Sequence, residues 1–191
     1  SSTRGNIRLT RPNRFHAKAI DETTRKYMGT LWNTYAFFIL YAEIDQFNPK
    51  EHPLDKAELT LMDRWILSRL NSLVREVDDD LNEYKIFEAS RAMTDFVDDL
   101  SNWYVRRSRE RFWGKGMAGD KEAAFATLYH VLETMSRLTA PFTPFMAENM
   151  YRNLVCSVDK DAPISVHMTD FPVCDEAYIS AELEGHMRDL L

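Results

Sequence analysis

Apolar residues recur at helical spacing through most of this 191-residue chain, and this pattern constrains the fold more than any other feature. Intervals of three and four place such residues on one face of a helix. Glycine and proline fall mostly between the periodic stretches. Long helices with short connections predict an all-α fold, an antiparallel bundle of four to five helices. We expect these helices over about residues 17–47, 58–82, 87–113, 120–139 and 145–154.

The sequence divides into four parts. Residues 1–16 form a basic, irregular lead-in, residues 17–160 the bundle, residues 161–174 an extended segment, and residues 175–191 the start of a following helix. Within the third part, residues 164–168 alternate in polarity and predict one short strand or simply extended chain. The chain does not begin with Met and stops within a helical pattern, so we expect it to be a piece of a longer protein.

One segment of the first predicted helix, Leu31–Leu40, is apolar on nearly every side. A helix of this kind is buried by several neighbours. We therefore expect Trp32 to lie in the core, and Trp65 of the second helix as well.

The composition excludes several classes of protein. The longest apolar-rich stretch, Leu31–Ile44, is interrupted by polar residues and is too short to span a bilayer. Cys156 and Cys174 have no metal-ligand spacing and indicate reduced thiols, so we expect a soluble cytoplasmic protein without a bound metal or cofactor. Gly114-Lys115-Gly116 lacks the spacing of a phosphate-binding loop, and no catalytic residues stand out.

The segment Asn102–Trp113 is the strongest indication of function. Four arginines and four aromatic residues share about three helical turns. Residues 106–121 hold six Lys/Arg against two Asp/Glu, whereas residues 41–105 hold seven against fifteen. Guanidinium groups suit phosphates, and aromatic rings stack on unpaired bases. The segment therefore predicts a nucleic-acid-binding helix, for RNA before DNA.

A helical wheel divides the predicted third helix into faces. Arg107 and Arg111 continue the stripe that we expect to face the core, so they either pair with internal carboxylates or contact a ligand. The apolar part of that stripe comprises Phe96, Leu100, Trp103 and Tyr104.

Arg106, Arg109 and Trp113 fall together on an adjacent side of the same helix. These arginines form either a solvated face or a phosphate-binding face. We favour phosphate binding, because Glu110 is the only acid within so dense a cluster.

Several segments together resemble the anticodon-binding domain of isoleucyl-tRNA synthetases, a class I family. The similarity covers about residues 17–173, with the most characteristic residues at 29–38, 62–71, 95–113, 140–148 and 165–172. Parts of it also occur in valyl- and leucyl-tRNA synthetases. The Arg-Arg-Ser-Arg pattern that follows Asn102-Trp103-Tyr104-Val105 favours the isoleucine branch.

The resemblance implies that the bundle grips the anticodon stem-loop of the isoleucine tRNA. The parent enzyme's catalytic domain would attach isoleucine using ATP and Mg²⁺, and it would be the bundle's other partner. Its His-Ile-Gly-His-type and Lys-Met-Ser-Lys-Ser-type motifs are absent, so this fragment should lack ligase activity. Carried over to this sequence, the tRNA-binding residues are Arg106, Arg107, Arg109, Arg111, Trp113 and Lys115.

Three alternatives remain open at this stage. The chain could be the equivalent domain of a valyl- or leucyl-tRNA synthetase, or a helical module for protein contacts that binds no RNA. The arginines of the lead-in either contact the tRNA or form a solvated tail; they are Arg4, Arg8, Arg11 and Arg14.

Overall fold

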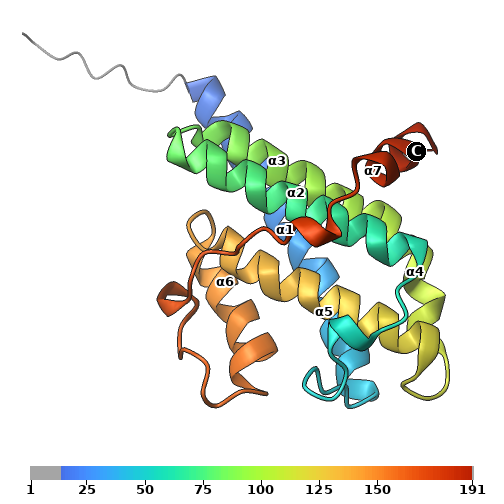
Figure 1. Ribbon diagram of the computed structural model, residues 1–191. Coiled ribbons are helices and arrows are strands. Elements are labelled where there is room, and N and C mark those ends of the chain that lie inside the picture. The colour runs from blue at the N-terminus through green and yellow to red at the C-terminus, as the bar shows by residue number, and fades with distance from the viewer. Residues whose placement is uncertain (1–13, 191) are drawn as a thin grey trace, which may run out of the picture.

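The protein is an all-α helical bundle, as the periodicity predicted (Figure 1). The computed structural model describes residues 14–190, with side chains from residue 22 onward, and no strand occurs in that range. The arginines of the lead-in up to Arg11 lie outside it. The α-helices are α1 (Arg14–Ile44), α2 (Leu61–Asn82), α3 (Ile86–Asp99), α4 (Arg106–Ser108), α5 (Gly119–Thr139), α6 (Pro144–Tyr151) and α7 (Ala181–Leu190).

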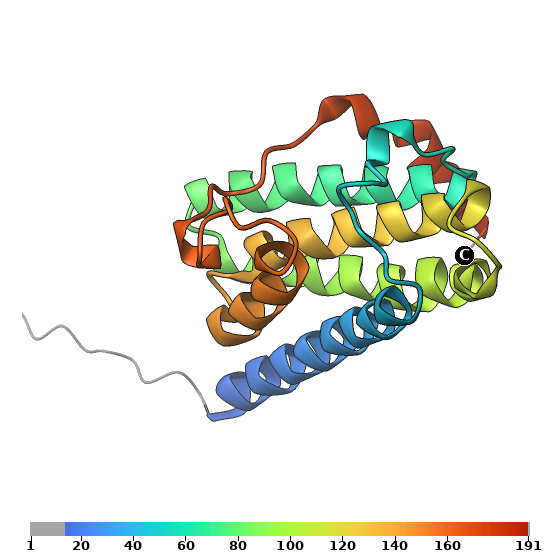
Figure 2. The same cartoon turned by 90° about the horizontal axis from the view of Figure 1, so that it is seen from below.

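Four helices enclose the core. α2 and α3 form a hairpin whose tight turn contains Tyr84 at a φ of 59°. α5 lies against both α2 and α1, and α1 crosses the bundle obliquely along one side (Figure 2). α6 packs on α5, and α7 is held on α2 by Ser68, whose Oγ accepts from the Ser180 amide at 2.8 Å. Among the residues described, no helix has the length and apolar content needed to cross a membrane.

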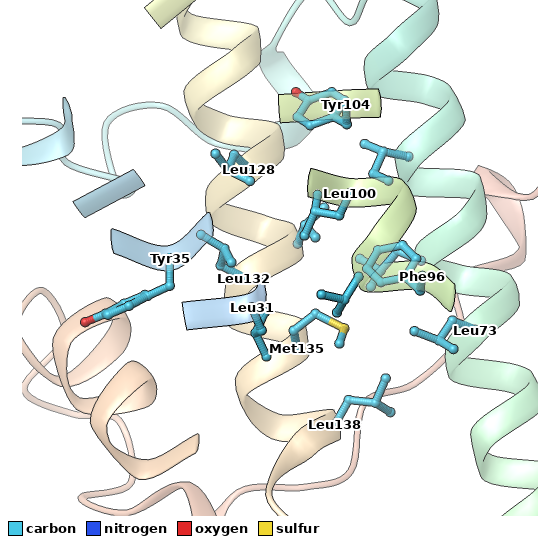
Figure 3. Packing of buried hydrophobic residues seen from close by; sticks show 14 of the residues in the cluster. Leu31, Tyr35, Leu73, Phe96, Leu100, Tyr104, Leu128, Leu132, Met135 and Leu138 are labelled. Atoms are coloured by element: carbon cyan, nitrogen blue, oxygen red, sulfur yellow. The ribbon is translucent and has the colours of Figure 1, made fainter. Parts of the chain in front are cut away.

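The core is filled by aliphatic and aromatic side chains that meet between these helices. Figure 3 shows Leu31 of α1, Phe96 of α3 and Leu132 of α5 directed into the same space. Trp65 is 1% exposed, as predicted. Burial of this apolar surface supplies the main driving force for folding.

The outer face of α1 departs from the prediction. Trp32 is 41% exposed and Leu40 is also exposed, so the expectation that Trp32 lies in the core is wrong. The inward face of α1 carries Leu31, Tyr35 and Phe38, which are buried. Trp32 and Leu40 lie outside this inward face, on sides of α1 that the described chain covers only partly. An all-round apolar segment therefore does not imply burial on every side.

The third predicted helix runs continuously from Ile86 to Trp113, but its winding changes along the way. After α3, residues Leu100–Val105 form a π-helix, α4 follows, and Arg109–Trp113 form a 3₁₀-helix. A π-turn holds more residues than an α-turn and a 3₁₀-turn holds fewer, so each change of winding shifts the faces of the helix.

The burial pattern records this shift. Phe96, Leu100 and Tyr104 are buried as predicted, whereas Trp103 packs against the core and is only partly buried. Phe112, which the uniform wheel did not place in the core stripe, is also buried.

In the C-terminal part, residues 164–168 were predicted to form one short strand or extended chain, and the structure has a turn there. Val166–Met168 form a single 3₁₀ turn, so the strand alternative is wrong. The polar groups of this segment bond to α6 instead of a neighbouring strand, because the Glu148 carboxylate accepts from Ser165 Oγ at 2.8 Å and from the Val166 amide at 3.1 Å. The flanking residues Ser165 and Thr169 are extended.

Candidate nucleic-acid interface

The end of the long helix and the loop after it, residues 106–115, carry the predicted binding residues. We refer to this segment as the arginine tail. Arg106, Arg107, Arg109 and Lys115 are all exposed in it. Among the side chains that the structure describes, no carboxylate forms an ion pair with any of these four. Their charges are therefore open to solvent and to an anionic ligand.

Two of the exposed guanidinium groups lie on aromatic rings. Arg107 is 4.9 Å from the ring centroid of Trp103, and Arg109 is 5.8 Å from that of Phe37 in α1. A guanidinium that rests on a ring keeps its N–H donors at its edges, where they remain available to a phosphate. Within the described part of the chain, Arg107 forms no ion pair with an internal carboxylate, which was one of its two alternatives.

Arg111 differs from its neighbours, because it is locked into the protein. Its Nη1 and Nη2 each donate to one carboxylate oxygen of Asp63 at 2.7 Å, and its Nε donates to Asp120 at 2.7 Å. The side chain is only 13% exposed. For Arg111, the pairing alternative raised by the helical wheel is therefore the observed one.

The partner of Arg111 is held by further bonds at the start of α2. Asp63 forms a capping box with Thr60 and accepts the Tyr104 hydroxyl at 2.6 Å. Burial acts to raise the pKa of Asp63, but the bonds from Arg111 and Tyr104 outweigh it and leave that pKa below its ordinary value. The ion pair is therefore charged at neutral pH and ties the arginine tail to α2.

Other acids around the arginine tail are also paired. Lys121 donates to Asp45 at 2.9 Å and to the Gly114 carbonyl at 2.6 Å, and His52 contacts Glu122 at 3.2 Å. Together with the bond from Arg111 to Asp120, these pairs engage three acids close to the tail in the sequence or the fold. Glu110, the one acid within the arginine tail, is itself exposed, so the four exposed cations of the tail face solvent with one carboxylate among them.

Trp113 ends the 3₁₀ segment and is 55% exposed. Its indole Nε1 donates a hydrogen bond to the Tyr41 hydroxyl of α1 at 2.9 Å. Tyr41 and Phe37 of α1 are therefore part of the site, although the sequence reasoning did not include them. No periodicity signals such contacts, since Tyr41 and Trp113 are 72 positions apart.

Comparisons with known proteins show the family of this chain. Residues 63–190 match the family model described as the anticodon-binding domain of tRNA ligase. The chain therefore belongs to the family of anticodon-binding domains of tRNA ligases.

Within that family, the chain is similar to isoleucine–tRNA ligases. It is 52% identical over 176 residues to the enzyme of Clostridium novyi (strain NT), and 49% identical over 176 residues to that of Clostridium tetani. It is 52% identical over 175 residues to an enzyme of Dehalococcoides mccartyi. Each alignment covers 92% of this chain but only 17% of the relative, so the chain spans about a sixth of the length of these ligases.

Proposed function

We propose that this chain is the part of an isoleucine–tRNA ligase that binds the anticodon stem-loop of the isoleucine tRNA. The observation that carries the proposal is the arginine tail, where unpaired guanidinium groups and an exposed tryptophan lie together on an otherwise acidic chain. An anticodon loop offers unstacked bases and closely spaced phosphates, which suit such a surface better than a duplex does.

The predicted residues take different parts in this proposal. Arg106, Arg107, Arg109 and Lys115 contact phosphates, and Trp113 contacts a base. Arg111 supports the surface from within, because Asp63 and Asp120 occupy its donors.

The chemistry belongs to the rest of the parent polypeptide. We propose a cytoplasmic ligase that uses ATP and Mg²⁺ in a catalytic domain outside this chain, and that domain is the second partner of the bundle. The 191-residue chain by itself then attaches no amino acid to tRNA.

Binding to the isoleucine tRNA at increasing salt tests the proposal. Four phosphate contacts on a largely single-stranded target give a log–log salt slope of about −3, from ~0.7 per contact. Replacing Arg106 and Arg109 together by Gln should make the slope shallower by about 1.4 and leave the helix content unchanged. A matched control replaces Arg25 and Arg75, which are also exposed but lie on α1 and α2 away from the arginine tail.

Each arm of this experiment separates one alternative. An unchanged slope in the Arg106/Arg109 variant would show that these residues do not contact the RNA. Tighter binding of a valine or leucine tRNA would assign the chain to one of the sister enzymes. Absence of binding at low salt would favour a module for protein contacts.

A further inference from the structure

Aromatic side chains of α1 form the support beneath the exposed part of the arginine tail. The rings of Phe37 and Tyr41 lie 4.9 Å apart, and both contact Phe112, at 5.2 and 6.4 Å. Phe112 is buried and lies 4.9 Å from Phe125 of α5. The two α1 rings are therefore fixed to the core from below.

The outer side of this support carries two residues of the arginine tail. Arg109 rests on the ring of Phe37, and Trp113 is bonded to the hydroxyl of Tyr41. We call the four residues Phe37, Tyr41, Arg109 and Trp113 the aromatic shelf. It places a cation and a large exposed ring on neighbouring parts of one rigid base.

The position of Trp113 in the chain makes its tether important. Trp113 is the last residue of the 3₁₀ segment, and Gly114 after it is extended. The hydrogen bond to Tyr41 is the one hydrogen bond of the Trp113 side chain among the described residues. Without it, a half-exposed side chain at the end of a helix would sample several rotamers.

We propose that Tyr41 is a positioning residue that holds Trp113 in place as the stacking surface for one unpaired base of the bound RNA. Arg109, fixed on Phe37, meets the phosphate next to that base. This inference rests on the proposed function and adds the residues of α1 to the binding surface. Because the ring is fixed before binding, its rotamer entropy is not lost when the base stacks on it.

The test compares variants of the 191-residue chain for affinity to the isoleucine tRNA. Trp113→Ala should weaken binding by about 5- to 150-fold, the range for loss of one base–aromatic stack. Tyr41→Phe removes only the hydroxyl and should weaken binding by about 2- to 10-fold, the cost of immobilising one side chain on binding. The salt slope should stay unchanged in both variants, because no phosphate contact is removed.

A second readout follows the tether without RNA. In a ¹⁵N–¹H spectrum, the indole signal of Trp113, assigned with Trp113→Phe, should move in Tyr41→Phe, and its proton should exchange faster with water. The matched control is Tyr129→Phe, which removes a 2.7 Å hydrogen bond to the Leu154 carbonyl away from the arginine tail. It should leave both the indole signal and the affinity unchanged.

The arms distinguish failure of this inference from failure of the proposed function. If the unmodified chain does not bind the tRNA, the proposed function fails, and the stacking role fails with it. If it binds but Trp113→Ala has unchanged affinity, Trp113 is not a stacking surface. If Trp113→Ala binds more weakly but Tyr41→Phe binds as tightly as the unmodified chain, Tyr41 has no positioning role. The same conclusion follows if Tyr41→Phe and the control Tyr129→Phe lose the same amount of affinity.

Discussion

Replacing Arg111 by Met should destabilise the fold strongly, although Arg111 belongs to a cluster of arginines that the sequence presents as a binding surface. Arg111 makes a two-pronged ion pair with Asp63, whose side chain is 0% exposed. Removal of one partner from such a pair leaves a buried charge without compensation and costs about 3–5 kcal/mol. The contact with Asp120 adds little, because that carboxylate is largely exposed.

Thermal and urea unfolding followed by circular dichroism measure this cost. For a chain of this length, 3–5 kcal/mol corresponds to a decrease of roughly 6–20 °C in Tm. Arg106→Met is the matched control, since Arg106 is exposed and should change stability by less than ~0.5 kcal/mol. The double variant Asp63→Leu/Arg111→Met should recover only part of the loss, because neither charge is then left alone but the Tyr104 hydroxyl and the Thr60 amide lose their acceptor.

Loss of less than ~1 kcal/mol in Arg111→Met would refute this reasoning, as would equal losses in Arg111→Met and Arg106→Met. Either result would mean that the ion pair contributes little net free energy. Arg111 would then be available as a direct contact for the RNA, as the resemblance alone implied.

Two further predictions concern pH and the core. Burial lowers the pKa of His130 below its ordinary 6.5. The negative charge of Glu133 acts to raise this pKa, and the positive charge of Arg137 lowers it further. The unfolded chain therefore binds a proton at a higher pH than the folded chain, so stability should fall as the pH drops below 6.5, and His130→Asn should reduce that slope in urea midpoints between pH 5 and 8. Trp65→Ala should cost ~3–5 kcal/mol, whereas Trp32→Gln should cost less than ~1 kcal/mol; similar losses in unfolding experiments would contradict the difference in burial.

The helices were predictable because their signal is local. Apolar spacing located α2 and α5 to within a few residues, and it identified Phe96 and Leu100 as core residues. The same periodicity identified the continuous helix up to Trp113, since each turn depends on residues three and four positions away.

Contacts between distant residues were not predictable in this way. The 48 positions between Asp63 and Arg111 contain no signal that they meet, and the composition of the arginine tail does not reveal which guanidinium is internal. Trp32 was misplaced for a related reason. The hydrophobic residues of a helix indicate how much apolar surface it can bury, but the arrangement of the neighbouring helices decides which face is covered.

The π-helical stretch Leu100–Val105 makes the number of residues before the arginine tail as consequential as their identity. Deleting one residue there would let the stretch wind as a regular α-helix, because a π-turn holds about one residue more than an α-turn, whereas inserting one residue would turn everything downstream by roughly 100° about the helix axis. With the insertion, Arg111 would leave Asp63, and a different side chain would point at that buried carboxylate. A one-residue insertion would therefore abolish the proposed RNA recognition while every arginine and tryptophan stays in the chain.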